Sequence, residues 1–123
     1  MVLTENLKLV ALGNPLLDMQ VRDGQEVLQK YSLKSNDAVL ASPEQLSIYG
    51  HLVENYQVTY VAGGAAQNTA RCAQYVLPQD STAYLGCVGN DDLAQQLRAA
   101  NEREGVQSVY PVSYTHLTLP TNR

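Results

Sequence analysis

The sequence has little positive charge and no long apolar run. It contains 8 Lys and Arg residues and 12 Asp and Glu residues, which gives a net charge of −4. The basic residues form no stripe along the sequence. A nucleic-acid backbone would find little electrostatic attraction, so we expect no nucleic-acid partner. No apolar run approaches the ~20 residues that span a bilayer, and residues 1–5 lack the basic start of a secretory signal. We therefore expect an intracellular protein without a membrane partner.

Cysteine and histidine are also scarce. Cys72 and Cys87 have neither a metal-ligand spacing nor nearby histidines, and both fall in apolar surroundings. We expect reduced, buried thiols and no metal site. His51 and His116 have no acidic or thiol partner nearby in sequence, so neither is a candidate catalytic base. The remaining composition, 45% hydrophobic and 16% charged over 123 residues, is that of one globular domain.

Alternating strand and helix patterns predict an α/β fold. The apolar run at residues 7–13 indicates a first strand, central in a parallel sheet and buried on both faces. Further strands are expected at residues 19–22, 38–40, 58–61, 82–85 and 106–112, and helices at 26–31, after 42–45, after 63–64 and over 92–105. The segment Ser42-Pro-Glu-Gln45 has the form of a capping box. We expect a parallel sheet with right-handed crossovers and a separate layer of small strands.

A pair of glycines separates a predicted strand from the helix that carries Asn68. Gly63 and Gly64 let a ligand approach the backbone, and the helix N-terminus presents free N–H groups, although such pairs also serve turn geometry alone. Neither G-x-G-x-x-G nor the phosphate-loop pattern is present, so phosphate binding is not supported. Asn is a poor helix-interior residue, which indicates that a ligand uses the Asn68 amide. Asn68 lies off the helix face that we expect to be buried, which comprises Ala66, Thr69, Ala70, Ala73 and Leu77.

Two further polar residues follow the first predicted strand. Asn14 and Asp18 lie where open α/β sheets bind ligands, at the carboxyl end of a strand. Together with a second amide they could hold a vicinal diol such as that of a ribose, because a carboxylate accepts two hydroxyl protons and an amide both donates and accepts. The alternative is a simple turn and a solvated loop acid. For Gly86, Gly89 and Asp91 we favour a turn followed by a helix cap.

Four motifs carry a family resemblance. "LGNPLLD" (12–18), "KYSLKSNDAVLA" (30–41), "AGGAAQNTAR" (62–71) and "GCVGNDD" (86–92), in this order and spacing, resemble the adenosine kinases of the ribokinase family of carbohydrate kinases over about residues 1–112. The resemblance implies a ribokinase-like fold, with a parallel sheet flanked by helices and a small β lid. The lid pieces would be residues 19–61 and 106–112, and the chain would be a truncated, N-terminal part of the kinase domain.

The resemblance also implies an activity and a site. Enzymes of this kind transfer a phosphoryl group from ATP, with Mg²⁺, to the 5′-hydroxyl of adenosine, and so produce AMP in purine salvage. Their catalytic aspartate and ATP site lie in a C-terminal half, so we expect no catalytic residue and no metal ligand in this chain, and no activity from it alone. Asn14, Asp18 and Asn68 would bind the ribose hydroxyls, Gly63 and Gly64 would let the backbone approach the sugar, and Leu16 and Leu40 would pack near the adenine.

Some alternatives stay open on the sequence alone. A Gly-Gly-Asn site can hold any polyol, so a sugar kinase of the same family is one alternative, and a non-catalytic nucleoside-binding module is another. The complete enzyme would be a monomer located in the cytoplasm, with the nucleus as a second compartment. Residues 113–123 do not fit the family pattern and resemble translated adapter sequence.

Overall fold

The structure, a computed structural model, describes residues 5–111. Our predictions about residues 1–4, His116 and the tail at 113–123 concern residues outside this range. The chain divides into two compact units, which are described separately. Unit 1 comprises Met1–Asp18 and Tyr60–Arg123, and unit 2 comprises Met19–Thr59.

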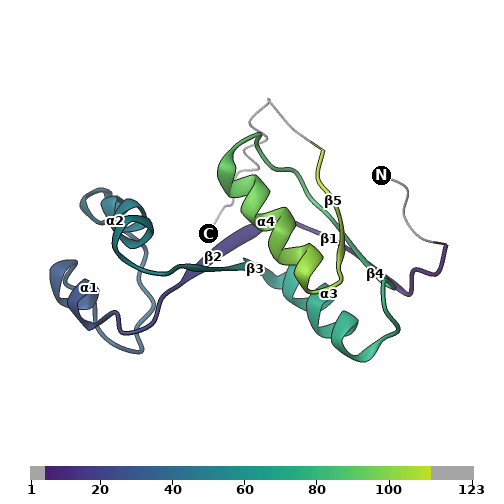
Figure 1. Ribbon diagram of the computed structural model, residues 1–123, viewed down its shortest axis with the longest axis horizontal. Helices are drawn as coiled ribbons and strands as arrows, with labels where there is room; N and C mark the ends of the chain where they lie inside the picture. Colours follow the sequence, from purple (N-terminus) through teal and green to yellow (C-terminus); the bar gives the residue numbers. More distant parts are fainter. Residues whose placement is uncertain (1–4, 112–123) are drawn as a thin grey trace. The chain divides into compact units, whose positions relative to one another are not determined.

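Unit 1 contains a parallel three-stranded sheet. Its strands are β1 (Leu9–Leu12), β4 (Thr82–Leu85) and β5 (Gln107–Val109), in the order β1-β4-β5 (Figure 1). Both strand pairs are parallel, with Leu9 opposite Thr82 and Ala83 opposite Gln107. Helices α3 (Ala65–Val76) and α4 (Asp92–Arg103) precede β4 and β5 respectively. The predicted α/β fold with a parallel sheet is therefore confirmed, whereas residues 107–109 belong to this main sheet and not to the small sheet that we expected.

The first strand does not have the central position that we predicted. Within the described residues β1 pairs only with β4, and β4 is the central strand. Leu9 and Ala11 pack toward the core on the helix-covered face, whereas Val10 and Leu12 are 56% and 77% exposed. Both helices of unit 1 pack on that one face, because α3 and α4 contribute to the same core cluster. The alternate residues of β1 consequently lack a cover within the described part of unit 1.

The core is built around Tyr84 on β4. Its side chain is fully buried, and its hydroxyl donates a hydrogen bond to the Gly13 carbonyl at 2.6 Å. Burial raises the pKa of Tyr84 and of Tyr110, so both hydroxyls keep their protons at neutral pH and can donate. The cluster also contains apolar residues from β3, α3, α4 and the ends of β5, namely Ala62, Ala70, Leu97, Ala100, Val106 and Tyr110.

The buried face of α3 agrees only in part with our prediction: Ala70 is buried and Ala66 packs against the core as expected, but the other two buried residues are polar. Its buried residues are Gln67, Ala70 and Gln74, whereas Thr69 is exposed and Ala66, Ala73 and Leu77 are only partly buried. The side-chain oxygen of Gln74, Oε1, accepts hydrogen bonds from the Thr82 backbone N–H at 3.1 Å and from the Thr82 hydroxyl at 2.8 Å. Amides occupy this face because the strand ends beneath it carry backbone groups that need partners.

Helix α4 begins and ends as its sequence predicts. The Asp91 carboxylate accepts a hydrogen bond from the Ala94 N–H at 2.8 Å, which confirms the helix-cap interpretation, and Gly105 follows the helix with a φ of +76°. Its buried residues are Ala94, Leu97, Ala100 and Asn101. Leu93, which we expected on this face, is 53% exposed because it borders an open hollow of about 200 Å³ instead of a packed strand.

Unit 2 is irregular apart from short helices. These are α1 (Gln25–Lys30), the 3-10 helix η1 (Pro43–Ser47) and α2 (Ile48–Asn55). The predicted capping box is present, and the Ser42 N–H donates to Gln45 Oε1 at 2.9 Å. Strands β2 (Leu16–Gln20) and β3 (Thr59–Gly63) form a separate two-stranded sheet. Residues 38–40 form no strand, because a strand needs a hydrogen-bonded neighbour and the described residues supply none there.

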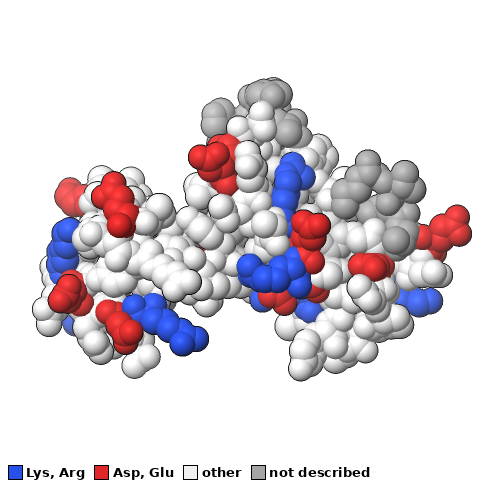
Figure 2. Space-filling view, in the orientation of Figure 1, with Lys and Arg blue, Asp and Glu red and all other residues white. Residues whose placement is uncertain are grey.

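Three further findings concern the cysteines, the surface charge and the length of the helices. Both cysteines are free and exposed, so our expectation of buried thiols was wrong: Cys72 lies on the outer side of α3, and Cys87 lies in the loop after β4. Acidic and basic side chains are interspersed over the visible face without a large patch of one sign (Figure 2). Among the described residues, no helix has the length and apolar character needed to cross a membrane.

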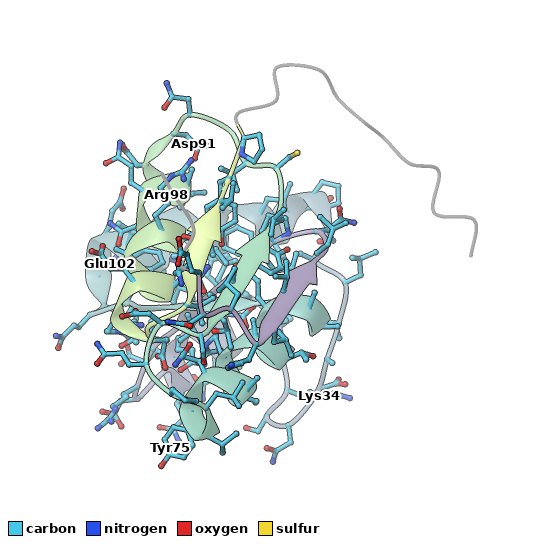
Figure 3. All side chains as sticks on the ribbon, turned by 90° about the vertical axis from the view of Figure 1, so that its right-hand side faces the viewer. Lys34, Tyr75, Asp91, Arg98 and Glu102 are labelled. Carbon is cyan, nitrogen blue, oxygen red and sulfur yellow. The ribbon has the colours of Figure 1, made fainter. Side chains whose placement is uncertain are left out.

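The polar network around Tyr110 yields a stability prediction. The Tyr110 hydroxyl donates to Gln67 Oε1 and accepts from the Asn101 amide, and all three side chains are buried. Replacing Tyr110 by Phe leaves two buried amides with one partner fewer, which should lower the free energy of unfolding by about 1–3 kcal/mol. Tyr75→Phe is the matched control, because Tyr75 at the end of α3 is 92% exposed (Figure 3). Urea unfolding measures both variants, and equal stabilities would contradict the role of the network.

Candidate functional site

The candidate site lies where strands of the main sheet end. Gly13 and Asn14 follow β1, and Gly86 follows β4, so these segments share the carboxyl edge of the sheet, where open α/β sheets bind ligands. A Cβ on Gly86 would lie only 2.9 Å from the Gly13 carbonyl oxygen. The two segments therefore touch, and glycine is required where they meet.

The structure brings the predicted glycine pair against the segment at 14–18. A Cβ on Gly63 would lie 2.5 Å from Asp18 Oδ2, and a Cβ on Gly64 would lie 3.1 Å from the Asn14 carbonyl oxygen and 3.5 Å from Leu16 Cγ. Five of the seven residues predicted for the site consequently lie together within unit 1. The absence of side chains at the two glycines is what makes this approach possible.

Asn14 and Asp18 are available to a ligand. Both residues are exposed, and within the described residues neither side chain makes a hydrogen bond or an ion pair. An ionised carboxylate accepts hydrogen bonds only, whereas a carboxamide both accepts and donates. The pair could therefore bind hydroxyl groups of a polyol without giving up an existing contact.

The helix that follows the glycines adds backbone donors and Asn68. Gly64 occupies the N-cap with φ 89° and ψ 150°, and no side chain caps the first turn of α3. The N–H groups of this turn can therefore meet a ligand oxygen. Asn68 is exposed and lies off the buried face, as predicted, and its Oδ1 accepts a hydrogen bond from Arg71 Nη1 at 3.3 Å.

The two predicted apolar residues differ in position. Leu16 lies on β2 next to Gly64 and is 55% exposed, so it can offer apolar surface beside the glycine pair. Leu40 belongs to unit 2 and is 98% exposed. Its role beside an adenine stays a prediction.

Other candidate groups show no catalytic arrangement. No set of three or more His, Cys, Asp or Glu among the described residues could hold a metal ion. His51 contacts Lys30 and Asn55 through Nδ1 and packs against Tyr31 and Tyr56, and none of these four contacts within the described residues is with a carboxylate.

The sequence reasoning missed Gln67 and Arg71. Gln67 donates hydrogen bonds from Nε2 to the Gly63 carbonyl at 2.6 Å and to the Leu16 carbonyl at 3.1 Å. Arg71 Nη1 donates to the Ala62 carbonyl at 2.9 Å as well as to Asn68. No signal in the sequence singled out Gln67, because Gln, unlike Asn, is a good helix-forming residue.

The chain was compared with known proteins. A family model described as "pfkB family carbohydrate kinase" matches residues 26–119. An adenosine kinase of Schizophyllum commune is 61% identical over 105 residues, which cover 85% of this chain and 30% of that protein. The chain thus spans about 30% of the length of this curated relative.

Two solved structures share the fold. The Anopheles gambiae adenosine kinase in complex with P1,P4-di(adenosine-5) tetraphosphate has a TM-score of 0.68 and 40% identity, covering 87% of this chain and 32% of that one. The apo adenosine kinase of Trypanosoma brucei brucei has a TM-score of 0.77 and 31% identity, covering 90% and 34%. The predicted ribokinase-like fold is therefore confirmed.

The two site glycines should respond differently to alanine. Gly64→Ala places a side chain at φ 89° and ψ 150°, a conformation essentially restricted to glycine, and should lower the free energy of unfolding by about 1–3 kcal/mol. Gly63 has no positive φ, so Gly63→Ala should mainly displace the exposed Asp18 carboxylate at a smaller cost. Thermal or urea unfolding compares them, with Gly24→Ala as a control of ordinary φ and ordinary contacts. A larger loss at Gly63 would contradict this assignment.

Proposed function

Because the chain belongs to the pfkB family of carbohydrate kinases, we propose that it is the ribose-binding part of an adenosine kinase. The complete enzyme transfers the terminal phosphoryl group of ATP to the 5′-hydroxyl of adenosine and releases AMP, a step of purine salvage. Support comes from the 61% identity to an adenosine kinase and from the likeness to the A. gambiae adenosine kinase, whose structure holds P1,P4-di(adenosine-5) tetraphosphate.

The observation that carries the proposal is the placement of Asp18 against Gly63. The carboxylate lies 2.5 Å from the position of a missing Cβ, so the absence of a side chain at Gly63 lets Asp18 sit directly beside the glycine backbone, where it is exposed and without a partner among the described residues. Asp18 would accept hydrogen bonds from two neighbouring hydroxyls, and Asn14 and Asn68 would supply further donors and acceptors. Gly63 and Gly64 would form the floor, and Leu16 and Leu40 would contact the base.

We propose ATP and Mg²⁺ as ligands of the complete enzyme and not of this chain alone. The described residues contain no set of three or more His, Cys, Asp or Glu that could hold a metal ion, and the sequence has no phosphate-loop pattern. We therefore derive no catalytic step from this chain. Its residues bind and orient adenosine, and positioning of this kind contributes substantially to phosphoryl transfer. The domain division, a monomeric state and a location in the cytoplasm and nucleus also stay predictions.

A kinase for a free sugar is the second candidate, because the family model describes carbohydrate kinases. Asp18, Asn14 and the glycines could hold the hydroxyls of a ribose or fructose equally well. Leu16 favours adenosine, because its half-exposed side chain beside Gly64 offers apolar surface that a free sugar does not need. A non-catalytic nucleoside-binding module is the remaining alternative.

A hybrid enzyme tests the proposal. Residues 1–112 of this chain replace the matching part of the S. commune adenosine kinase, and AMP formation from adenosine and Mg-ATP is measured, with ribose as the competing substrate. We expect adenosine kinase activity, and we expect none from the 123-residue chain alone. A hybrid that prefers ribose would favour the sugar kinase, and a hybrid that binds adenosine without turnover would favour the binding module.

Asp18→Ala in this hybrid tests the site. Losing a carboxylate that accepts two hydroxyl protons should lower kcat/KM for adenosine roughly 100-fold or more. Glu54→Ala is the matched control, because Glu54 is an exposed carboxylate on α2. Full activity of the Asp18 variant would refute the role given to Asp18.

A further inference from the structure

We propose that Arg71 is a positioning residue that determines which end of the Asn68 amide faces the ligand. The inference rests on the proposed function, in which Asn68 binds a ribose hydroxyl. It concerns the polarity of that contact, for which the sequence offers no signal.

The guanidinium of Arg71 is held by three acceptors. Nη1 lies 2.9 Å from the Ala62 carbonyl oxygen on β3 and 3.3 Å from Asn68 Oδ1. Nη2 lies 3.7 Å from Glu104 Oε1, just after α4, and the Arg71 side chain is 24% exposed. Because Arg71 and Asn68 are three residues apart on α3, their side chains are neighbours on the helix surface. The hydrogen bond to the Ala62 carbonyl on β3 fixes Nη1, so the guanidinium offers Asn68 a fixed partner, whereas Glu104 contacts the other terminal nitrogen, Nη2.

The hydrogen bond between Arg71 and Asn68 can run in only one direction, from the guanidinium to the amide oxygen. A guanidinium only donates hydrogen bonds, so the amide oxygen of Asn68 must face it. The NH₂ group is consequently turned away from Arg71. An exposed Asn without such a partner can turn its amide by half a turn and present either end. Arg71 thereby makes Asn68 a hydrogen-bond donor toward the ligand.

This polarity complements that of Asp18. The carboxylate accepts from the ligand, and Asn68 donates to it, so the site presents one acceptor group and one donor group of fixed identity. A ligand hydroxyl can satisfy either. The ligand atom that meets Asp18 must carry a hydrogen, whereas the ligand atom that meets Asn68 needs only a lone pair.

A double-mutant cycle in the hybrid enzyme tests the coupling. Arg71→Met keeps a long side chain but removes the donors, and it should raise the KM for adenosine about 5- to 10-fold with little change in kcat. Arg71→Lys, which keeps a donor, should restore most of the affinity. In an Asn68→Ala background, Arg71→Met should raise KM no further. Glu104→Gln, which removes the ion pair without touching Asn68, should leave KM unchanged.

A second measurement needs no activity. In the ¹⁵N-labelled 123-residue chain, the NH₂ signals of Asn68 should shift in Arg71→Met and keep their position in Glu104→Gln. Unchanged Asn68 signals in Arg71→Met would overturn the inference, as would additive effects on KM in the cycle, which would show that Arg71 acts through Ala62 and the fold alone. A hybrid without adenosine kinase activity would instead refute the proposed function, and the NMR result would still decide the role of Arg71.

Discussion

The buried amide of Gln67 is the contact on which the site region depends. Nε2 donates to the carbonyls of Leu16 and Gly63, and Oε1 accepts from Asn101 and from the Tyr110 hydroxyl. A carboxamide has two donor hydrogens and two acceptor lone pairs, so one side chain that is 1% exposed uses its whole capacity. In a low-dielectric interior each unmade bond would be costly, and this arrangement therefore holds β2, β3, α3 and α4 in one geometry.

This arrangement of strands and helices also places the residues of the candidate site. The strand ends supply Asn14, Leu16 and Asp18, while the turn into α3 supplies the glycines and uncapped N–H groups. Within the described residues the Asn14 and Asp18 side chains have no hydrogen bond or ion pair that a ligand would have to replace. The carbonyls of Ala62 and Gly63, which lead into the turn, are each held by a side chain of α3.

Local chemistry explains which features could be predicted from sequence. The limits of β4, the capping box at Ser42, the Asp91 cap and the glycine turn each depend on residues a few positions apart, and the structure contains all of them. The edge position of β1, the missing strand at 38–40 and the exposure of Leu93 depend on which distant segments lie alongside. Gln67 escaped notice because three of its four partners, Leu16, Asn101 and Tyr110, are distant from it in the sequence.

The pairing of β1 with β4 also has a consequence for how the chain acquires its structure. Gly13 and Tyr84, which are joined by a hydrogen bond at this pairing, are 71 residues apart in the sequence. For two strands this far apart to pair, the chain must first close a long loop. The loss of conformational entropy comes before any stabilising contact forms, which slows folding. On a ribosome that adds 5–20 residues per second, β1 would wait roughly 4–14 s for its partner to be synthesised. During that interval the apolar residues of β1 lack the neighbouring strand with which they pair in the folded chain.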